Sequence, residues 1–180
     1  MSTGRETFMA ITAEEVIKML GLIPHEREGG YYRETYRADE MIPPDALPAR
    51  YGGTRTFGTA IYYLLTPGTC SIMHRVTSDE IFHFYQGDQV EMLQLHPDGT
   101  GEVCLLGNAL GSGYRFQVVV PRGTWQGSCL SEGGTFALMG TTVAPGFDYS
   151  DYQEGNRDDL LERYPGFREL ITRLTPPPGG

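Results

Sequence analysis

The feature that most constrains the fold is the spacing of short β-rich runs between residues 55 and 143. These runs are rich in aromatic and β-branched residues and begin about every ten residues, with turn pairs such as Asp98-Gly99 between them. Strands at this spacing are typical of sandwiches and barrels, whereas βαβ units alternate strands with longer helical segments. The sequence therefore predicts an all-β fold. Its predicted strands span residues 30–37, 56–66, 70–76, 80–86, 89–96, 101–106, 115–120, 124–130 and 135–143.

A short helix is predicted before the first strand. Thr12 and Glu15 match a capping box, in which the two side chains satisfy backbone N–H groups at the start of a helix. The apolar residues that follow are spaced to form one buried face. We therefore predict a helix over about 13–20 that ends at Gly21, a residue suited to the left-handed conformation of a helix C-terminus.

The whole chain, residues 1–180, is predicted to be a single domain. Its 180 residues, 39% of them hydrophobic, are enough to bury one core. The barrel is expected over about 30–143. The pattern changes after Pro145, and a C-terminal helical cap is expected over about 156–174. Short helices therefore flank the barrel on both sides.

Charge and cysteine content limit the expected partners and location. The 23 acidic and 14 basic residues give a net charge of −9, which disfavours a nucleic-acid partner. The sequence contains no run of about 18 apolar residues, so no membrane span is predicted. Residues 1–11 lack the apolar core of a signal peptide, so none is predicted there. Cys70, Cys104 and Cys129 lack metal-site spacing and are expected to be free thiols, which favours a cytoplasmic location.

One stretch of the chain carries the strongest functional signal. Gly68, His74, Glu80 and Gly87 occur at the spacing of a glycine, a histidine, a glutamate and a second glycine in the pattern G-x5-H-x-H-x3-E-x6-G. This stretch resembles the first motif of the cupin superfamily. Val76 occupies the position at which that motif has its second histidine.

A second segment completes the resemblance. Pro121, Gly123 and Gln126 match the cupin pattern P-x-G-x2-H, with glutamine where the third histidine normally lies. Residues 28–37, 71–80 and 120–126 are also similar to the Cupin_5 (DUF985) subfamily, and this likeness extends over nearly the whole chain. The resemblance implies a double-stranded β-helix, that is, a jelly-roll barrel with an internal pocket, and commonly a homodimer. It implies no particular reaction.

The metal site of an ordinary cupin is incomplete in this sequence. Such a site uses three imidazoles and one carboxylate, whereas the matching positions here offer His74, Glu80 and Gln126. Val76 cannot coordinate a metal, and an amide oxygen is a weak ligand for transition metals. We therefore predict no strongly bound cofactor, and at most a loosely bound divalent transition metal. His83 lies an odd number of residues after Glu80, so a regular strand would point it away from the pocket.

Two functional interpretations stay open from the sequence. In the first, the chain is a small-molecule-binding cupin, and its predicted ligand-binding residues are His74, Glu80, Gln126, Trp125 and Tyr63. In the second, it is an enzyme acting on a small polar metabolite. That enzyme would be either a weakly metal-dependent oxygenase, isomerase or lyase, or a metal-free epimerase-like catalyst that uses His74 and Glu80 as an acid/base pair.

Three other polar residues receive simpler interpretations. His25 falls in a predicted loop, where a solvated position explains it adequately. Arg33 and Glu34 are interpreted as a charge pair at an exposed strand edge, as a dimer contact or as part of the pocket rim, with the first two favoured.

Overall fold

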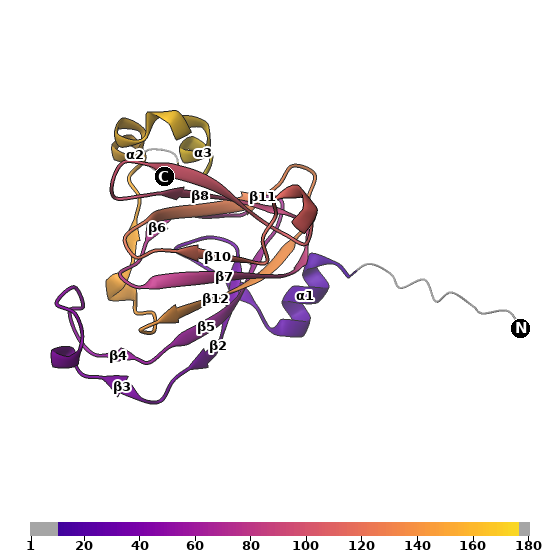
Figure 1. The fold of residues 1–180 in the computed structure, drawn as a ribbon. Helices are drawn as coiled ribbons and strands as arrows, with labels where there is room; N and C mark the ends of the chain where they lie inside the picture. The colour runs from indigo at the N-terminus through magenta and orange to yellow at the C-terminus, as the bar shows by residue number, and fades with distance from the viewer. Residues whose placement is uncertain (1–10, 177–180) are drawn as a thin grey trace, which may run out of the picture.

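The computed structural model describes residues 11–176, which form two facing antiparallel sheets closed into a barrel (Figure 1). Residues 1–10 and 177–180, which the predicted single domain also includes, lie outside the described part. One sheet has the strand order β1-β2-β5-β12-β7-β10, and the other has the order β13-β6-β11-β8-β9. The all-β jelly-roll prediction is therefore confirmed.

The strand bounds agree closely with the predicted runs, which differ from them mainly at the ends. The first sheet contains β1 (Ile23–Pro24), β2 (Tyr31–Arg37), β5 (Thr59–Leu65), β12 (Ala137–Ala144), β7 (Asp79–Gly87) and β10 (Gln117–Val120). The second contains β13 (Gln153–Glu154), β6 (Cys70–Arg75), β11 (Trp125–Leu130), β8 (Val90–Leu95) and β9 (Gly101–Leu106). A separate pair is formed by β3 (Met41–Ile42) and β4 (Arg55–Thr56).

Helices lie on both sides of the strand-rich region. The capping box at α1 (Ala13–Leu20) is present, with the Glu15 N–H 3.2 Å from Thr12 Oγ1, and Gly21 ends the helix at a φ of 61°. The chain ends in α2 (Arg157–Arg163) and α3 (Arg168–Arg173), which cover the outer side of the second sheet (Figure 1). Four single-turn 3₁₀ helices complete the list: η1 (Pro44–Ala46), η2 (Leu110–Ser112), η3 (Tyr149–Asp151) and η4 (Pro165–Phe167).

Alternation along the strands decides which side chains enter the barrel. On β7, Glu80, Phe82 and Phe84 are buried, whereas the intervening His83 and Tyr85 are more exposed and lie on the outer face. The buried phenylalanines join an inner cluster that includes Met92, Leu106 and Met139. Each such side chain contributes roughly 1.5–3 kcal/mol on burial. This inner packing holds the first sheet against the second.

The segment of residues 145–155 ties the two sheets together at one end of the barrel. Its first part is bound to the first sheet, since the Phe147 N–H donates to Thr59 Oγ1 at 3.0 Å. Its last part is bound to the second sheet through β13, which pairs with β6. Between these points, Arg55 and Asp151 form a bidentate ion pair with two distances of 2.7 Å, and both side chains are 5% exposed. The segment is therefore fixed at three places.

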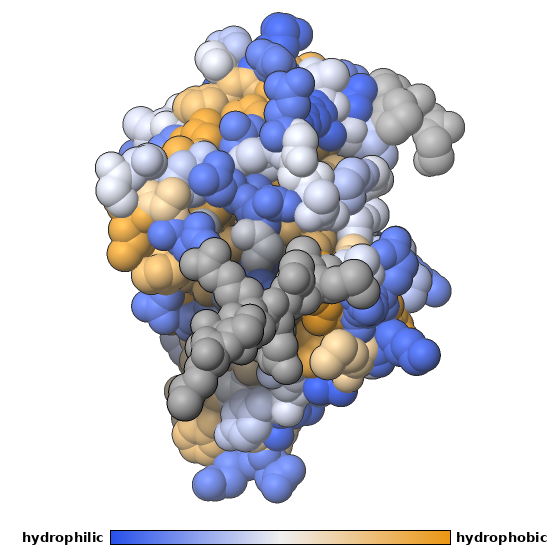
Figure 2. All heavy atoms as spheres, turned by 90° about the vertical axis from the view of Figure 1, so that its right-hand side faces the viewer, coloured by the Kyte–Doolittle hydropathy of each residue, from blue (hydrophilic) through white to orange (hydrophobic). Residues whose placement is uncertain are grey.

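The surface agrees with the acidic composition. The face shown in Figure 2 is largely covered by hydrophilic residues, with smaller hydrophobic patches between them. Within residues 11–176, no helix combines the length and the apolar character needed to cross a lipid bilayer.

Strand β2 pairs with β1 only at Tyr31 and Tyr32, so residues 33–37 have no partner strand on that edge among the described residues. The predicted homodimer stays a prediction.

The close approach at Gly87 gives a test of the fold. Gly87 has a φ of 102°, and a Cβ atom there would lie 2.3 Å from the carbonyl oxygen of Phe136. We expect Gly87→Ala to lower the free energy of unfolding by at least about 1 kcal/mol, because both the φ angle and the contact disfavour a side chain. Urea denaturation measures this change.

The matched control is Gly111→Ala, since a Cβ atom at Gly111 would meet nothing within 4 Å. That substitution is expected to change the free energy of unfolding by less than about 0.5 kcal/mol. Equal effects of the two substitutions would contradict the packing described around Gly87.

Candidate functional site

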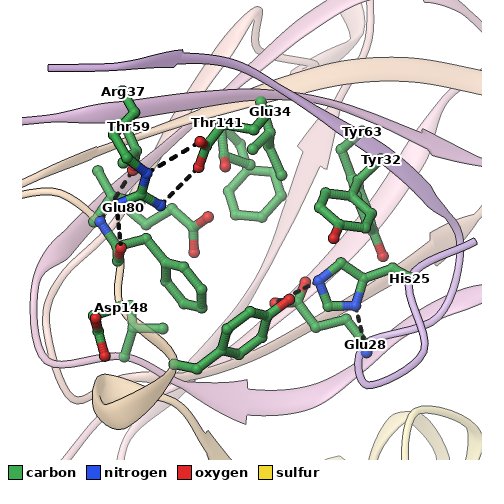
Figure 3. Close-up of a pocket in the computed structure, with 16 residues that line it drawn as sticks. His25, Glu28, Tyr32, Glu34, Arg37, Thr59, Tyr63, Glu80, Thr141 and Asp148 are labelled. Carbon is green, nitrogen blue, oxygen red and sulfur yellow. Dashed lines mark hydrogen bonds and ion pairs between the residues drawn. The ribbon is translucent and has the colours of Figure 1, made fainter. Parts of the chain in front are cut away.

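A cavity of about 390 Å³ lies inside the barrel, next to the first sheet (Figure 3). Strands β2, β5, β7 and β12 contribute its walls, together with the loop before β2 and the segment after β12. Both polar and apolar side chains face it. The lining residues are His25, Glu28, Tyr32, Glu34, Arg37, Thr59, Ile61, Tyr63, Val76, Glu80, Phe82, Thr141, Val143, Phe147, Asp148 and Tyr149.

Three of the predicted site residues meet beside this cavity, although they come from three strands. His74 lies on β6, Glu80 on β7 and Gln126 on β11, and their exposed fractions are 1%, 8% and 1%. The amide nitrogen of Gln126 donates to Glu80 Oε2 at 2.5 Å and lies 3.4 Å from His74 Nε2. Gln126 therefore links the imidazole and the carboxyl group.

The hydrogen bonds of His74 define its protonation. Its Nδ1 atom lies 2.8 Å from the carbonyl oxygen of Ile72, and because a carbonyl only accepts, Nδ1 carries the hydrogen. The Nε2 atom then carries a lone pair, toward which the Gln126 amide points. Burial lowers the pKa of His74, although the neighbouring charge of Glu80 opposes this shift. His74 is thus a neutral imidazole with a free acceptor nitrogen.

Glu28 and His25 join this group, although the sequence did not predict either as a site residue. Glu28 Oε1 lies 3.8 Å from His74 Nε2 and 3.9 Å from His25 Nε2. The Glu28 N–H donates to His25 Nδ1 at 2.9 Å, so the hydrogen of His25 is on Nε2 and faces the carboxyl group. His25 is only 7% exposed, and its interpretation as a solvated loop residue was wrong.

Two glycines bring Glu28 to the cavity. Gly29 and Gly30 have positive φ angles of 84° and 69°. A Cβ atom on Gly29 would lie 2.4 Å from the Cys70 carbonyl oxygen, so only glycine allows the loop to press against the barrel there. Tyr63 strengthens this contact, because its hydroxyl donates to the Gly29 carbonyl at 2.8 Å. The sequence signals at this position were the pair Gly29-Gly30 after Glu28 and the similarity of residues 28–37 to the Cupin_5 subfamily.

Glu80 is buried and the side chain of Glu28 is 14% exposed, and neither carboxyl group has a cationic side chain paired with it among residues 11–176. Burial raises the pKa of Glu28, and the proximity of His25 opposes the shift. Burial also raises the pKa of Glu80, and the charge of Glu28 adds to this effect, whereas His74 and the hydrogen bonds from Gln126 and Thr141 oppose it. Arg37, the guanidinium at the cavity, is bound to Glu34 at 3.0 and 2.7 Å. Both carboxyl groups are therefore biased toward the protonated form.

The other predicted residues occupy different places. Tyr63 lines the cavity and is 1% exposed, and burial raises its pKa well above the usual value. Val76 also lines the cavity, so the missing histidine position is part of its apolar wall. Trp125 is not a cavity residue, because it neighbours Gln126 on β11 and strand alternation turns it to the opposite face. There it packs against the C-terminal helices, with the Arg75 guanidinium 4.4 Å from the ring centroid.

The remaining candidates lie on the first sheet, His83 and Arg33 on its outer face and Glu34 on the face toward the cavity. His83 bonds to Thr142 at 2.9 Å and stacks with Tyr85, away from the cavity, as strand alternation predicts. Arg33 lies over the ring of Tyr62 at 5.7 Å, whereas Glu34 lines the cavity. Arg33 and Glu34 therefore lie on opposite faces of β2 and form no charge pair with each other.

The donor set does not fit a transition metal ion. Among the described residues, no group of three or more His, Cys, Asp or Glu side chains is arranged to hold one. The Gln126 amide presents its NH₂ group, not its oxygen, to both Glu80 and His74. His25 has its hydrogen on Nε2, the nitrogen that faces Glu28, so this atom is a donor and not a metal ligand.

The raised pKa of Glu28 makes a testable prediction about stability. A group whose pKa is raised on folding contributes stability at low pH, and this contribution is lost as the pH rises from 4.5 through the folded pKa. Glutamine imitates the protonated carboxyl group at every pH. We therefore expect Glu28→Gln to be more stable than the natural protein at pH 8, by on the order of 1 kcal/mol, with a smaller difference at pH 5.

Thermal or urea unfolding at the two pH values measures this difference. Glu132→Gln is the control, because Glu132 is exposed and should show little dependence on pH. If Glu28→Gln becomes less stable than the natural protein as the pH rises, the ionised carboxylate is stabilised by its surroundings, contrary to the site described above.

Comparisons with known proteins agree with this architecture. The Cupin_5 family model, described as cupin superfamily (DUF985), matches residues 14–154. An uncharacterised protein of Saccharomyces cerevisiae, YML079W, is 31% identical over 162 residues, which cover 85% of this chain and 80% of the yeast protein.

Two solved structures are similar over almost the whole chain. Protein SO0799 from Shewanella oneidensis has a TM-score of 0.82 and 33% sequence identity, covering 93% of this chain and 99% of the other. A hypothetical protein from Leishmania major has a TM-score of 0.81 and 31% identity, covering 92% and 99% of the two chains.

Proposed function

The chain belongs to the DUF985 family of the cupin superfamily, and we propose that its barrel cavity binds a small polar molecule. One observation carries this proposal: the buried carboxyl group of Glu80 and that of Glu28, whose side chain is 14% exposed, both face a cavity of about 390 Å³, a volume within the usual range for small-molecule sites. The ligand contacts are assigned to Glu28, Glu80 and Tyr63, with His74 and Gln126 supporting Glu80 from behind.

The cavity wall supports the same proposal. Phe82, Ile61 and Val143 provide apolar surface, while hydrogen bonds orient the Glu80 carboxyl group and the Tyr63 hydroxyl group. Binding sites for small molecules commonly combine such an apolar lining with a small number of oriented polar groups. The geometry favours a ligand that has one polar end and one apolar end.

A second candidate function is metal-free acid–base catalysis on the bound molecule. The observation that favours it is the distance of 3.8 Å between His74 Nε2 and Glu28 Oε1. A neutral imidazole can accept a proton, and a carboxyl group with a raised pKa keeps a proton to donate at a higher pH than an ordinary glutamate. Exchange of substrate hydrogen for deuterium from solvent, lost in Glu28→Gln, would support catalysis.

Blocking the cavity tests the binding proposal. Val143→Phe adds bulk to the lining, and Val119→Phe is the control because Val119 is 54% exposed on β10. We expect a member of a panel of small polyols, amines and carboxylates to stabilise the natural protein and the control. At a hundredfold excess over its Kd, the ligand should add about 2.7 kcal/mol, measured by thermal unfolding.

The same ligand is expected to leave the folded Val143→Phe variant unchanged. A ligand that stabilises Val143→Phe as strongly as the natural protein binds elsewhere and would contradict the proposal. A panel in which no compound binds the natural protein would also contradict it.

A further inference from the structure

The charges around the cavity are unbalanced. Four carboxyl groups line it, from Glu28, Glu34, Glu80 and Asp148, against the single guanidinium of Arg37. Arg37 is already bound to Glu34 and to the carbonyl oxygen of Phe147. A buried carboxylate is stabilised by a cation or by several hydrogen bonds, so this arrangement lacks a positive group at its inner end.

Behind Glu80, outside the residues that line the cavity, Gln126 and His74 have acceptor atoms with unused capacity, and the buried Tyr152 hydroxyl beside His74 also has no partner among the described residues. Gln126 Oε1 is buried and accepts no hydrogen bond from a described residue, and Gln126 as a whole is 1% exposed. The Nε2 atom of His74 has a lone pair whose nearest donor, the Gln126 amide, is 3.4 Å away. Figure 3 shows the Glu80 carboxyl group projecting into the cavity, with Glu28 and His25 on its other side. A complementary ligand must bring donors.

The cavity also has aromatic walls suited to a cation. Tyr32, Phe82, Phe147 and Tyr149 line it. The ring of Tyr149 already has a cation over it, since the guanidinium of the exposed Arg27 lies 4.8 Å from its centroid. Aromatic faces attract cations, most strongly where water is excluded.

We infer that the ligand of this cavity carries a protonated amine, whose N–H groups lie between Glu80 and Glu28 and whose apolar part packs on the aromatic walls. This inference rests on the proposed small-molecule binding and adds the chemical class of the ligand. A protonated amine supplies the counter-charge that favours the ionised form of Glu28 and Glu80, a neutral ligand supplies none, and an anionic ligand would disfavour that form further.

Three probes of similar size and different charge test the inference: cyclohexylmethylamine, cyclohexylmethanol and cyclohexanecarboxylate. Titration calorimetry at pH 7.5 measures each Kd with the natural protein. We expect the amine to bind at least tenfold more tightly than the alcohol, and the carboxylate to bind most weakly.

Charge-neutral variants show whether the carboxyl groups cause the preference. Glu80→Gln and Glu28→Gln keep the shape of the side chain, and each should weaken amine binding about tenfold while changing alcohol binding less than twofold. Glu132→Gln, which alters an exposed carboxylate, is the control and should change neither Kd.

The outcomes separate this inference from the proposed function. If the alcohol or the carboxylate binds as tightly as the amine, and Val143→Phe abolishes that binding, the preference for an amine is refuted while binding in the cavity is supported. Failure of all three probes to bind contradicts both. Titration with Zn²⁺ alone gives the last outcome. If Zn²⁺ binds stoichiometrically, if its binding is lost in Glu80→Gln, and if it prevents the amine from binding, the carboxyl groups form a metal site and the inference is overturned.

Discussion

The constraint on which the site depends is that two carboxyl groups largely withdrawn from solvent, those of Glu28 and Glu80, meet at one cavity without a cation bound to either among the described residues. Glu28 and Glu80 approach the same imidazole from different directions, Glu28 directly at 3.8 Å and Glu80 through the Gln126 amide. Removing a carboxylate from water without a counter-charge costs several kcal/mol, so the groups favour the protonated form. Keeping such groups at a cavity lowers stability, and this is the feature on which the proposed ligand binding rests.

The barrel holds these groups by ordinary packing and backbone contacts. Strand alternation on β7 sends Glu80 and Phe82 inward together, so the carboxyl group shares its side of the sheet with the hydrophobic core. Glu28 lies in a loop, so it is positioned by other contacts than strand alternation. The Gly29 backbone fits against Cys70, and Tyr63 binds the Gly29 carbonyl from within the barrel. Both carboxyl groups are therefore positioned by the rigid part of the molecule.

Much of this could be predicted from local sequence patterns. The strands follow from the alternation of apolar residues and from turns such as Asp98-Gly99, and the convergence of His74, Glu80 and Gln126 follows from the spacing shared with other cupins. The outward position of His83 required only the two-residue repeat of a strand. Trp125 follows the same rule, and it lies outside the cavity because its neighbour Gln126 points toward the site.

The part that could not be predicted depends on contacts between distant segments. His25 and Glu28 reach the cavity only because their loop packs on strands β5 and β6, which come some forty residues later in the sequence. A glutamate before two glycines usually indicates a solvated turn, and nothing local shows that Gly29 is pressed against a carbonyl group. The mismatch between the donor set and a transition metal ion likewise depends on which hydrogen atoms Gln126 and His25 present, and this follows only from their partners.

The most direct test of this account is the titration of the two carboxyl groups themselves. Carbon-13 NMR of protein labelled at the glutamate carboxyl carbon, with resonances assigned from Glu28→Gln and Glu80→Gln, follows each group across the pH range. The account predicts that both resonances titrate with midpoints above the ordinary glutamate value of 4.5. Midpoints at or below that value for both groups would show that the carboxylates are already compensated, and would contradict the central claim.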